Sequence, residues 1–173
     1  MSDSAEIHPS RIDPKKLLEQ CRVTFTRRSG PGGQNRNKVE TAAVLEHLPT
    51  GLRAEAAECR TQGENRRAAL FRLRMLLALE LRSPQKDGEI LPSLLWTSRC
   101  KGGRISVNPE HDDVPALLAE ALDALAVCGM DVPAAASALG CSSTQLTRFL
   151  QVEPRALGLV NEHRRSIGLK PLR

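Results

Sequence analysis

The chain has 173 residues and a net charge of +5, with 40% hydrophobic, 26% charged and 2% aromatic residues. This composition is that of a globular protein with one ordinary or two small domains, and it excludes a largely disordered chain. The scarcity of aromatic rings argues against a protein that reads single-stranded bases by stacking, and no apolar run is long enough to cross a membrane.

The charge is unevenly placed along the chain. Residues 1–82 contain 15 lysines and arginines against 10 aspartates and glutamates, whereas residues 83–173 contain 10 of each class. Because neutralising phosphates releases counterions, the basic half favours a polyanionic partner. A solvated basic surface is the alternative that charge alone leaves open.

The cysteines and the N-terminal segment indicate a compartment. Five cysteines are scattered without a Cys-x-x-Cys pair, which fits reduced thiols in a cytosol and argues against a cysteine metal site. Residues 1–16 lack the apolar core of a secretory signal, and they are too rich in acidic residues for an organellar presequence. We therefore expect a cytoplasmic protein with no membrane partner, no metal and no organic cofactor.

The first half of the chain predicts a compact α+β unit over roughly residues 15–82. Residues 21–28 alternate apolar and polar side chains as a strand does, and they run into a glycine-rich loop. Two further short strands are expected between residues 41 and 59, around the turn Pro49-Thr50-Gly51.

A helix over residues 61–82 is the strongest of the predicted elements. Thr61 and Glu64 have the spacing of a capping box, leucines recur at helical intervals, and Pro84 lies just beyond the expected end. Residues 83–112 are expected to form a linker or a β-hairpin, with 90–97 and 104–107 as the paired strands.

Residues 113–173 predict a helical module. Three prolines stand in first turns, two glycines follow helix ends, and a serine and a glutamine have capping-box spacing: these are Pro115, Pro133, Pro154, Gly129, Gly140, Ser142 and Gln145. The two middle helices have the order of a helix-turn-helix. Such a pair can bind nucleic acid or simply pack three short helices, and the neutral charge of this half favours packing.

The stretch RRSGPGGQNRNK, residues 27–38, connects the first two predicted strands. It is not a Walker-type phosphate loop, because Lys38 follows Asn37 where that loop requires a glycine, and it lacks the last glycine of a dinucleotide fingerprint. Taken alone, a Gly-Pro-Gly-Gly turn is most often a surface turn, and a lone Gly-Gly-Gln tripeptide is weak evidence.

An ordered series of motifs over residues 20–80 resembles the catalytic domain of class-I peptide chain release factors. In that family an Arg/Ser-rich strand end leads into Gly-Pro-Gly-Gly-Gln, then Asn-Lys-Val/Thr-Glu, then two strands around a Pro-Thr-Gly-like turn. An Arg-Ser-Gln…Asn segment follows and starts a helix. Here that segment reads Arg60-Thr61-Gln62 with Asn65, and Arg36 replaces a residue that is usually small and apolar.

The resemblance implies a fold and an activity. The expected fold is α+β: a short mixed or antiparallel sheet with a packed helix and an exposed Gly-Gly-Gln loop, followed by the helix-turn-helix-like module. The implied reaction is hydrolysis of the peptidyl-tRNA ester in the peptidyl-transferase centre of the large ribosomal subunit. Gly32, Gly33 and Gln34 would form the catalytic tip, with the Gln34 backbone N–H stabilising the oxyanion and its side chain positioning the water.

The resemblance also implies partners. The side chains expected to contact ribosomal or transfer RNA are Arg27, Arg28, Ser29, Asn35, Arg36, Asn37, Lys38, Arg60, Gln62, Arg66 and Arg67. Gln34 is, by the same resemblance, a candidate substrate for a glutamine methyltransferase.

Only about twenty residues precede the motif strand, too few for a stop-codon-reading domain. We therefore expect a likeness to the short, codon-independent members of the family that rescue stalled ribosomes, with domains at 1–82, 83–112 and 113–173. Those members commonly end in a long basic tail; here the helical module takes its place and is expected to contact ribosomal RNA or tRNA.

Two alternatives remain at this point. One is a ribosome-associated RNA-binding protein that keeps the fold without catalysis, against which the intact Gly32-Gly33-Gln34 tripeptide counts. The other is a helix-turn-helix DNA-binding regulator, against which the neutral charge of residues 83–173 counts.

Overall fold

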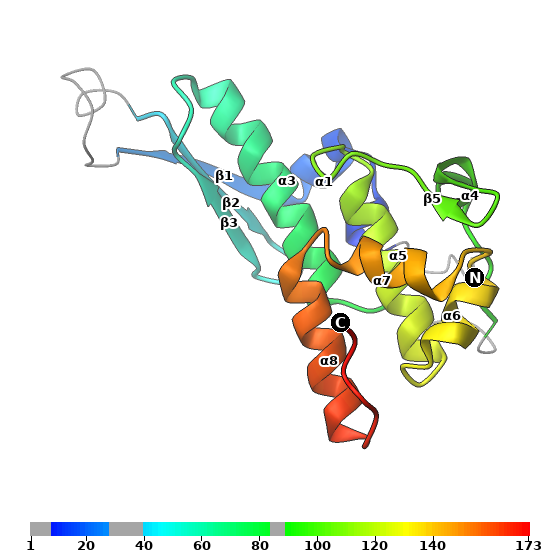
Figure 1. Cartoon of the computed structure of the whole chain (residues 1–173). Helices are drawn as coiled ribbons and strands as arrows, with labels where there is room; N and C mark the ends of the chain where they lie inside the picture. Colours follow the sequence, from blue (N-terminus) through cyan, green and yellow to red (C-terminus); the bar gives the residue numbers. More distant parts are fainter. Residues whose placement is uncertain (1–7, 28–39, 84–88) are drawn as a thin grey trace, which may run out of the picture. The chain divides into compact units, whose positions relative to one another are not determined.

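The computed structural model of the chain describes residues 8–27, 40–83 and 89–173 (Figure 1). It is an α+β structure, which confirms the predicted fold class. The contacts divide it into two compact units, Pro9–Leu77 and Ala78–Arg173, and His8 belongs to the second unit. The division falls inside a helix, whereas the sequence placed a boundary after residue 82.

The first unit is built on a three-stranded antiparallel sheet. Its strands are β1 (Cys21–Thr26), β2 (Ala42–His47) and β3 (Arg53–Ala56), three strands as the sequence predicted, and they lie in the order β1-β2-β3. The register places Val23 opposite Leu45, and Leu45 opposite Ala54. Leu45 is fully buried, because alternate residues of this central strand face the core of the unit.

The turn between β2 and β3 is fixed by a histidine. Gly51 has the positive φ of +70° that favours glycine, and its N–H donates to the His47 carbonyl over 2.8 Å. The buried His47 ring contacts Thr50 Oγ1 at 2.8 Å through Nδ1 and Gln20 Oε1 at 3.2 Å through Nε2. Burial lowers the pKa of His47, so the neutral ring is the form that suits this position.

Helix α3 (Gln62–Glu80) follows β3. The N-cap half of the predicted capping box is confirmed, because the Glu64 N–H donates to Thr61 Oγ1 over 3.2 Å; the Thr61 hydroxyl in turn donates to Glu64 Oε2 over 2.8 Å. Ala69, Leu73 and Leu77 on one face are fully buried. A short 3-10 helix η1 (Pro9–Arg11) and helix α1 (Pro14–Glu19) precede the sheet.

The second unit begins with a correction to the sequence prediction. The stretch expected as the first strand of a hairpin contains helix α4 (Leu94–Arg99), and only β4 (Cys100–Lys101) and β5 (Arg104–Ile105) pair around the glycine turn. The helix forms because the Ser93 hydroxyl accepts from the Trp96 N–H over 3.0 Å as an N-cap. Helix α4 also buries the indole of Trp96, which is 1% exposed.

Helix α5 (Val114–Val127) forms the centre of this unit, and nearly every side chain from Val114 to Leu125 is buried. The buried Glu120 carboxylate accepts from the Ser93 N–H over 2.7 Å and from the Ser93 hydroxyl over 2.6 Å, which ties the start of α4 to α5. The Trp96 indole N–H donates to the Leu139 carbonyl over 2.7 Å, and its ring meets Phe149 edge to face.

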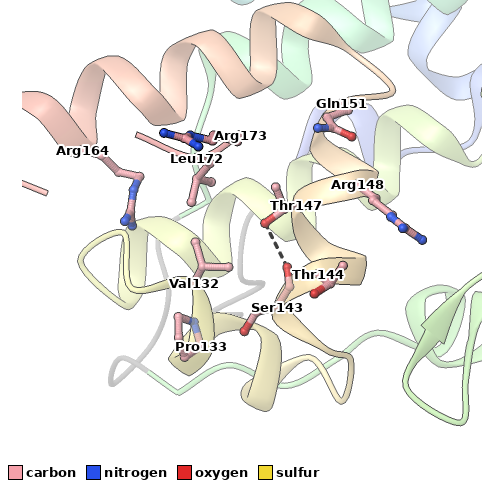
Figure 2. A pocket seen from close by; sticks show the side chains of 10 residues that line it. All are labelled: Val132, Pro133, Ser143, Thr144, Thr147, Arg148, Gln151, Arg164, Leu172 and Arg173. Atoms are coloured by element: carbon pink, nitrogen blue, oxygen red, sulfur yellow. Dashed lines mark hydrogen bonds between the residues drawn. The ribbon is translucent and has the colours of Figure 1, made fainter. Parts of the chain in front are cut away.

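Three helices complete the unit: α6 (Val132–Ala138), α7 (Ser143–Leu150) and α8 (Pro154–Ser166). The first two are joined through Gly140, whose φ of +68° suits glycine, and the Ser142 hydroxyl accepts from the Gln145 N–H over 3.2 Å as the predicted N-cap. This is the helix-turn-helix-like order expected from the sequence. Figure 2 shows the outer face of α7, where Thr147 bonds back to Ser143.

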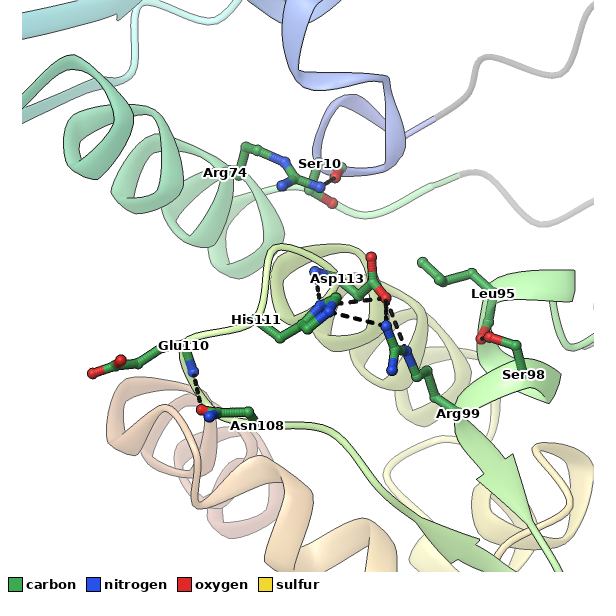
Figure 3. A network of polar contacts seen from close by, with 9 residues as sticks. All are labelled: Ser10, Arg74, Leu95, Ser98, Arg99, Asn108, Glu110, His111 and Asp113. Carbon is green, nitrogen blue, oxygen red and sulfur yellow. Dashed lines mark hydrogen bonds and ion pairs between the residues drawn. The ribbon is translucent and has the colours of Figure 1, made fainter. Parts of the chain in front are cut away.

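Polar contacts fix the segments outside these helices. In the first unit, the buried Arg74 donates to the Ser10 carbonyl over 3.1 Å (Figure 3). In the second, the Arg99 guanidinium lies 2.6 Å from Asp113 Oδ2, and His111 contacts both side chains. That cluster joins the end of α4 to the start of α5.

Candidate functional site

The residues that the sequence places at the catalytic tip, Gly32, Gly33 and Gln34, lie outside the described residues. So do six of the expected RNA contacts: Arg28, Ser29, Asn35, Arg36, Asn37 and Lys38. The structure describes the two chain ends from which this segment leaves and returns, and the side chains around them.

Those two ends lie at one edge of the sheet. Antiparallel pairing sets Thr26, the last residue of β1, opposite Ala42, the first residue of β2. Arg27 and Glu40 therefore stand near one another, with Arg27 Nε 3.5 Å from Glu40 Oε1. The side chains are 64% and 51% exposed, so solvent screens the pair and it adds little to the stability of the fold.

The beginning of α3 holds the returning end of the chain. The Gln62 side-chain amide donates from Nε2 to the Glu40 carbonyl over 2.7 Å. The sequence assigned Gln62 to RNA, whereas in this structure its amide donor is bonded to the backbone at the point where the chain re-enters the sheet. The capping box at Thr61 sets the position of Gln62, because it fixes where α3 begins.

Asn65 is the most deeply buried polar residue at this edge, with no exposed surface. Its Nδ2 donates to the Thr41 carbonyl over 2.7 Å and to the Cys59 carbonyl over 3.0 Å, while its Oδ1 accepts from the Cys59 N–H over 2.9 Å. One side chain thus joins the start of β2, the segment after β3 and helix α3. We call Arg27, Glu40, Thr41, Gln62 and Asn65 the strand-end cluster.

Asn65 belongs to the family motif, but no role was predicted for it from the sequence. Its spacing carried a usable signal, because Asn65, Ala69 and Leu73 recur every four residues along the buried face of α3. An amide on that face must find hydrogen-bond partners inside the unit, since an unpartnered buried amide is costly.

Three of the expected RNA-binding arginines, Arg60, Arg66 and Arg67, are exposed around the start of α3. Among the residues that the structure describes, none of the three forms an ion pair with a carboxylate. Arg72 differs, because its Nη2 lies 2.6 Å from Glu58 Oε1 and its Nη1 donates to the Glu55 carbonyl over 2.7 Å. The exposed arginines can therefore bind an anionic partner without first breaking an internal ion pair.

Glu58, which follows β3, forms the ion pair with Arg72. Burial would raise the pKa of Glu58, but the backbone N–H groups of Ala57 and Glu58 and the Arg72 guanidinium outweigh it, so the pKa lies below its usual value. The acidic side chain is thereby kept ionised and paired with Arg72. Among the described residues, no group of three or more metal-ligating side chains occurs.

Within residues 8–27, 40–83 and 89–173 the structure contains no helix that is both long and apolar enough to span a membrane. The edge of the sheet presents exposed guanidinium groups around two chain ends that are held by the buried amide of Asn65 and the exposed amide of Gln62. Such an arrangement can hold a connecting segment in place and attract phosphate groups toward it.

Comparison with known proteins identifies the region that contains this edge. Residues 7–92 match the family model of the RF-1 domain. The chain is 44% identical over 70 residues to the chloroplastic peptide chain release factor PrfB1 of Arabidopsis thaliana, which covers 39% of this chain and 15% of that protein. It is 43% identical over 81 residues to peptide chain release factor 1 of Streptococcus thermophilus. That match covers 45% of this chain and 21% of that protein.

A third relative agrees with these two. Peptide chain release factor 1 of Streptococcus pyogenes is 42% identical over 81 residues, covering 45% of this chain and 21% of that protein. The chain thus matches about a fifth or less of the length of these curated relatives. Residues 7–92 are thus an RF-1 domain, and this region of the chain belongs to the class-I peptide chain release factor family.

Proposed function

We propose that the protein hydrolyses the ester bond of peptidyl-tRNA on the ribosome and so releases the nascent peptide. The observation that carries the proposal is the RF-1 domain match over residues 7–92, because that region includes Gly-Gly-Gln at residues 32–34 between β1 and β2. The relatives are named peptide chain release factors, and the proposal extends that activity to this chain.

The chemistry follows from what ester hydrolysis requires. Attack by water places negative charge on the carbonyl oxygen, and a backbone N–H directed at that oxygen lowers the barrier. In the proposal Gln34 supplies this N–H. Gly32 and Gly33 have no Cβ, so the backbone can approach RNA closely and adopt conformations closed to other residues.

The Gln34 side chain has a different task. An amide does not titrate near neutral pH, so it cannot act as a general base, and we assign it to positioning the water. Arg27, Arg60, Arg66 and Arg67 would neutralise phosphates of ribosomal and transfer RNA around the tip. The ribosome supplies most of the active site in this scheme, so we expect little hydrolysis by the isolated protein.

The strand-end cluster supports this scheme because it holds the chain next to the tip. A tip that must enter a catalytic cavity needs a fixed attachment to the domain, since small displacements of a catalytic group are costly in rate. Asn65 and Gln62 bind the backbone of Thr41 and Glu40, directly after the segment that contains Gln34. We assign both to positioning, with no contact to the reacting ester.

The proposal includes release without a stop codon. It follows the resemblance to the short, codon-independent members of the family, and the family match covers residues 7–92. The partners are then the large-subunit RNA and peptidyl-tRNA, with a glutamine methyltransferase acting on Gln34 as a further proposed partner. The protein would act in the compartment that holds those ribosomes.

Release from stalled ribosomes tests the proposal. Ribosomes would be stalled on one message that ends without a stop codon and on a matched message with a stop codon in the A site, and peptide release would be measured after adding the purified protein. We expect similar release from both messages, and none without the protein. Release only with the stop codon would contradict codon independence.

The same assay separates the non-catalytic alternative. Co-sedimentation of the protein with the stalled ribosomes would be measured in parallel with release. Binding without release of peptide from either message would contradict the hydrolase and favour a ribosome-associated protein that lacks catalysis.

A further inference from the structure

The second unit contains a pocket on the outer side of helices α6 and α7. Its volume is about 470 Å³, and its lining comes from the start of α6, the exposed face of α7, Arg164 of α8 and the C-terminal residues Leu172 and Arg173 (Figure 2). All of these elements belong to the same compact unit.

The lining of the pocket is cationic and rich in hydroxyl groups. Arg148, Arg164 and Arg173 are its charged side chains, and no aspartate or glutamate side chain is among the lining residues. This contrasts with residues 83–173 as a whole, where acidic and basic residues are equal in number. The neutral total therefore conceals a local concentration of positive charge.

The arginines are spread along the pocket. Figure 2 shows Arg164 and Arg148 on either side of Thr147, with Ser143 and Thr144 also at the pocket. Ser143 and Thr144 are the first two residues of α7, where backbone N–H groups carry the positive end of the helix dipole. A row of cationic and hydroxyl donors suits a ligand with several anionic groups better than a single small anion.

One wall of the pocket is held in place by specific hydrogen bonds. Asn161, which is 9% exposed, accepts from the Leu172 N–H over 2.6 Å and donates to the Leu172 carbonyl over 3.1 Å. These two bonds fold the C-terminal segment back along α8. Leu172 is therefore set at the pocket before any ligand binds, and Arg173 follows it directly in the chain.

Arg164 is fixed in the same way. Its Nε donates to the Lys170 carbonyl over 2.8 Å, and its Nη1 donates to the carbonyl of Met130, a non-glycine residue with a φ of +64°. A guanidinium that is already oriented loses less freedom when it binds a phosphate than a mobile one does. The pocket is thus preorganised for an anionic ligand.

We propose that this arginine pocket binds the phosphate backbone of RNA. Phosphates match the charge of the lining, and the lining has no aromatic side chain on which a base could stack, so we expect contact with the backbone without sequence preference. The choice of RNA over DNA rests on the proposed function, because on the ribosome the polyanion that surrounds the protein is RNA.

Binding by the full chain tests this inference. A fluorescein-labelled RNA hairpin and a DNA hairpin of the same sequence would be titrated with wild type and with the double variant Arg148→Gln/Arg173→Gln, at several salt concentrations. The double variant Lys101→Gln/Arg104→Gln is the matched control, because it also removes two positive charges, and Lys101 and Arg104 are exposed residues of the same unit that do not line the pocket. Trp96, buried in this unit, reports by fluorescence that each variant is folded.

We expect the pocket variant Arg148→Gln/Arg173→Gln to bind the RNA about tenfold more weakly than wild type, with a salt dependence reduced by about one to two ions. Lys101→Gln/Arg104→Gln should change the affinity much less. Asn161→Ala keeps every charge but frees the C-terminal segment, so we expect it to weaken binding about threefold. Equal affinity of the pocket variant and Lys101→Gln/Arg104→Gln would overturn the inference, as would tighter binding of the DNA hairpin.

Two further measurements complete the test. The first asks whether the ligand of the pocket is RNA or an acidic protein, and the second tests the proposed function separately from ligand binding at the pocket. Polyglutamate that competes as strongly as RNA at equal charge would indicate an acidic protein partner and contradict the proposal. Peptide release from stalled ribosomes would be measured on the same samples. Wild type that releases no peptide while the RNA-affinity pattern holds would overturn the proposed function and the choice of RNA that rests on it, leaving only a cationic pocket that binds anions.

Discussion

Asn65 shows how one side chain can determine the geometry of a site that it does not enter. Its amide joins Thr41, at the start of β2, to Cys59, after β3, through three hydrogen bonds inside the first unit. The Gln62 amide makes one similar bond to Glu40, but at the surface. Both side chains hydrogen-bond the backbone, but Asn65 is buried and Gln62 is exposed. We therefore expect different losses of stability when each is replaced.

We predict that Asn65→Ala lowers the free energy of unfolding by about 3 kcal/mol, since it removes three hydrogen bonds to part-buried backbone groups of Thr41 and Cys59. Gln62→Ala should cost about 1 kcal/mol or less, because water can replace an exposed hydrogen bond. Urea denaturation of the two variants measures both values. Equal losses would show that Asn65 is no more than another surface contact.

His47 provides a pH-dependent contribution at the other end of the sheet. Burial lowers the pKa of His47 in the folded protein below its ordinary value of 6.5. The unfolded chain therefore binds a proton more readily, so the stability that His47 provides is complete above about pH 7 and is lost as the pH falls below 6.5.

A variant with a side chain that does not titrate at residue 47 isolates the pH-dependent contribution of His47 to stability. We predict that the stability difference between wild type and His47→Gln narrows as the pH is lowered from about 7.5 to about 5, because other titrating groups affect both proteins alike. Urea denaturation at each pH measures the difference. A difference that stays constant over this range would mean that the His47 ring does not favour the neutral form.

At the scale of elements, the start of α3 controls the position of Gln62 and Asn65. Thr61→Ala removes the N-cap and should lower the free energy of unfolding by about 1 kcal/mol. Thr61→Ser keeps the hydroxyl and should remain within about 0.3 kcal/mol of wild type. Thermal or urea unfolding compares the two, and an equal loss in both would show that the methyl group of Thr61, not its hydroxyl, matters.

Elements with a strong local signal were predictable from the sequence. The three strands of the sheet alternate side chains or flank a proline-glycine turn, and α3 has its cap and its leucine spacing. In the second unit, α5 and α6 likewise start and stop at the expected prolines and glycines, and α7 and α8 start at the expected Ser142 and Pro154. Periodicity and capping are properties of neighbouring residues, so they can be read locally.

Elements decided by distant contacts were not predictable in this way. The sequence of α4 suits a strand, and it becomes a helix where Ser93 meets Glu120 and Trp96 meets Leu139 and Phe149. Helix α1, with six residues, is too short to show a helical period. The buried bonds of Asn65 likewise depend on Thr41, which is 24 residues away. None of these partners could be identified before the fold was known.

At the scale of the whole molecule, two kinds of positive surface occur in one chain. The first unit carries exposed arginines around the start of α3, and the second carries the arginine pocket despite its neutral total charge. The net charge of each half of the chain therefore underestimated the positive surface of the second unit, because the sum includes carboxylates such as Glu120 that are buried in helix contacts. Local placement, not the total, decides what a surface can bind.

The central claim is that the backbone at Gly32-Gly33-Gln34 carries peptide release, and one substitution tests it most directly. Gly158→Ala is the matched control, because Gly158 lies in α8 with nothing within 4 Å of an added Cβ, so it should release peptide as wild type does. Gly33→Ala adds the same methyl group at the tip, and we predict that it lowers the rate of peptide release from stalled ribosomes on the order of a hundredfold. Release by Gly33→Ala at the wild-type rate, with both proteins bound to the ribosome, would contradict the account.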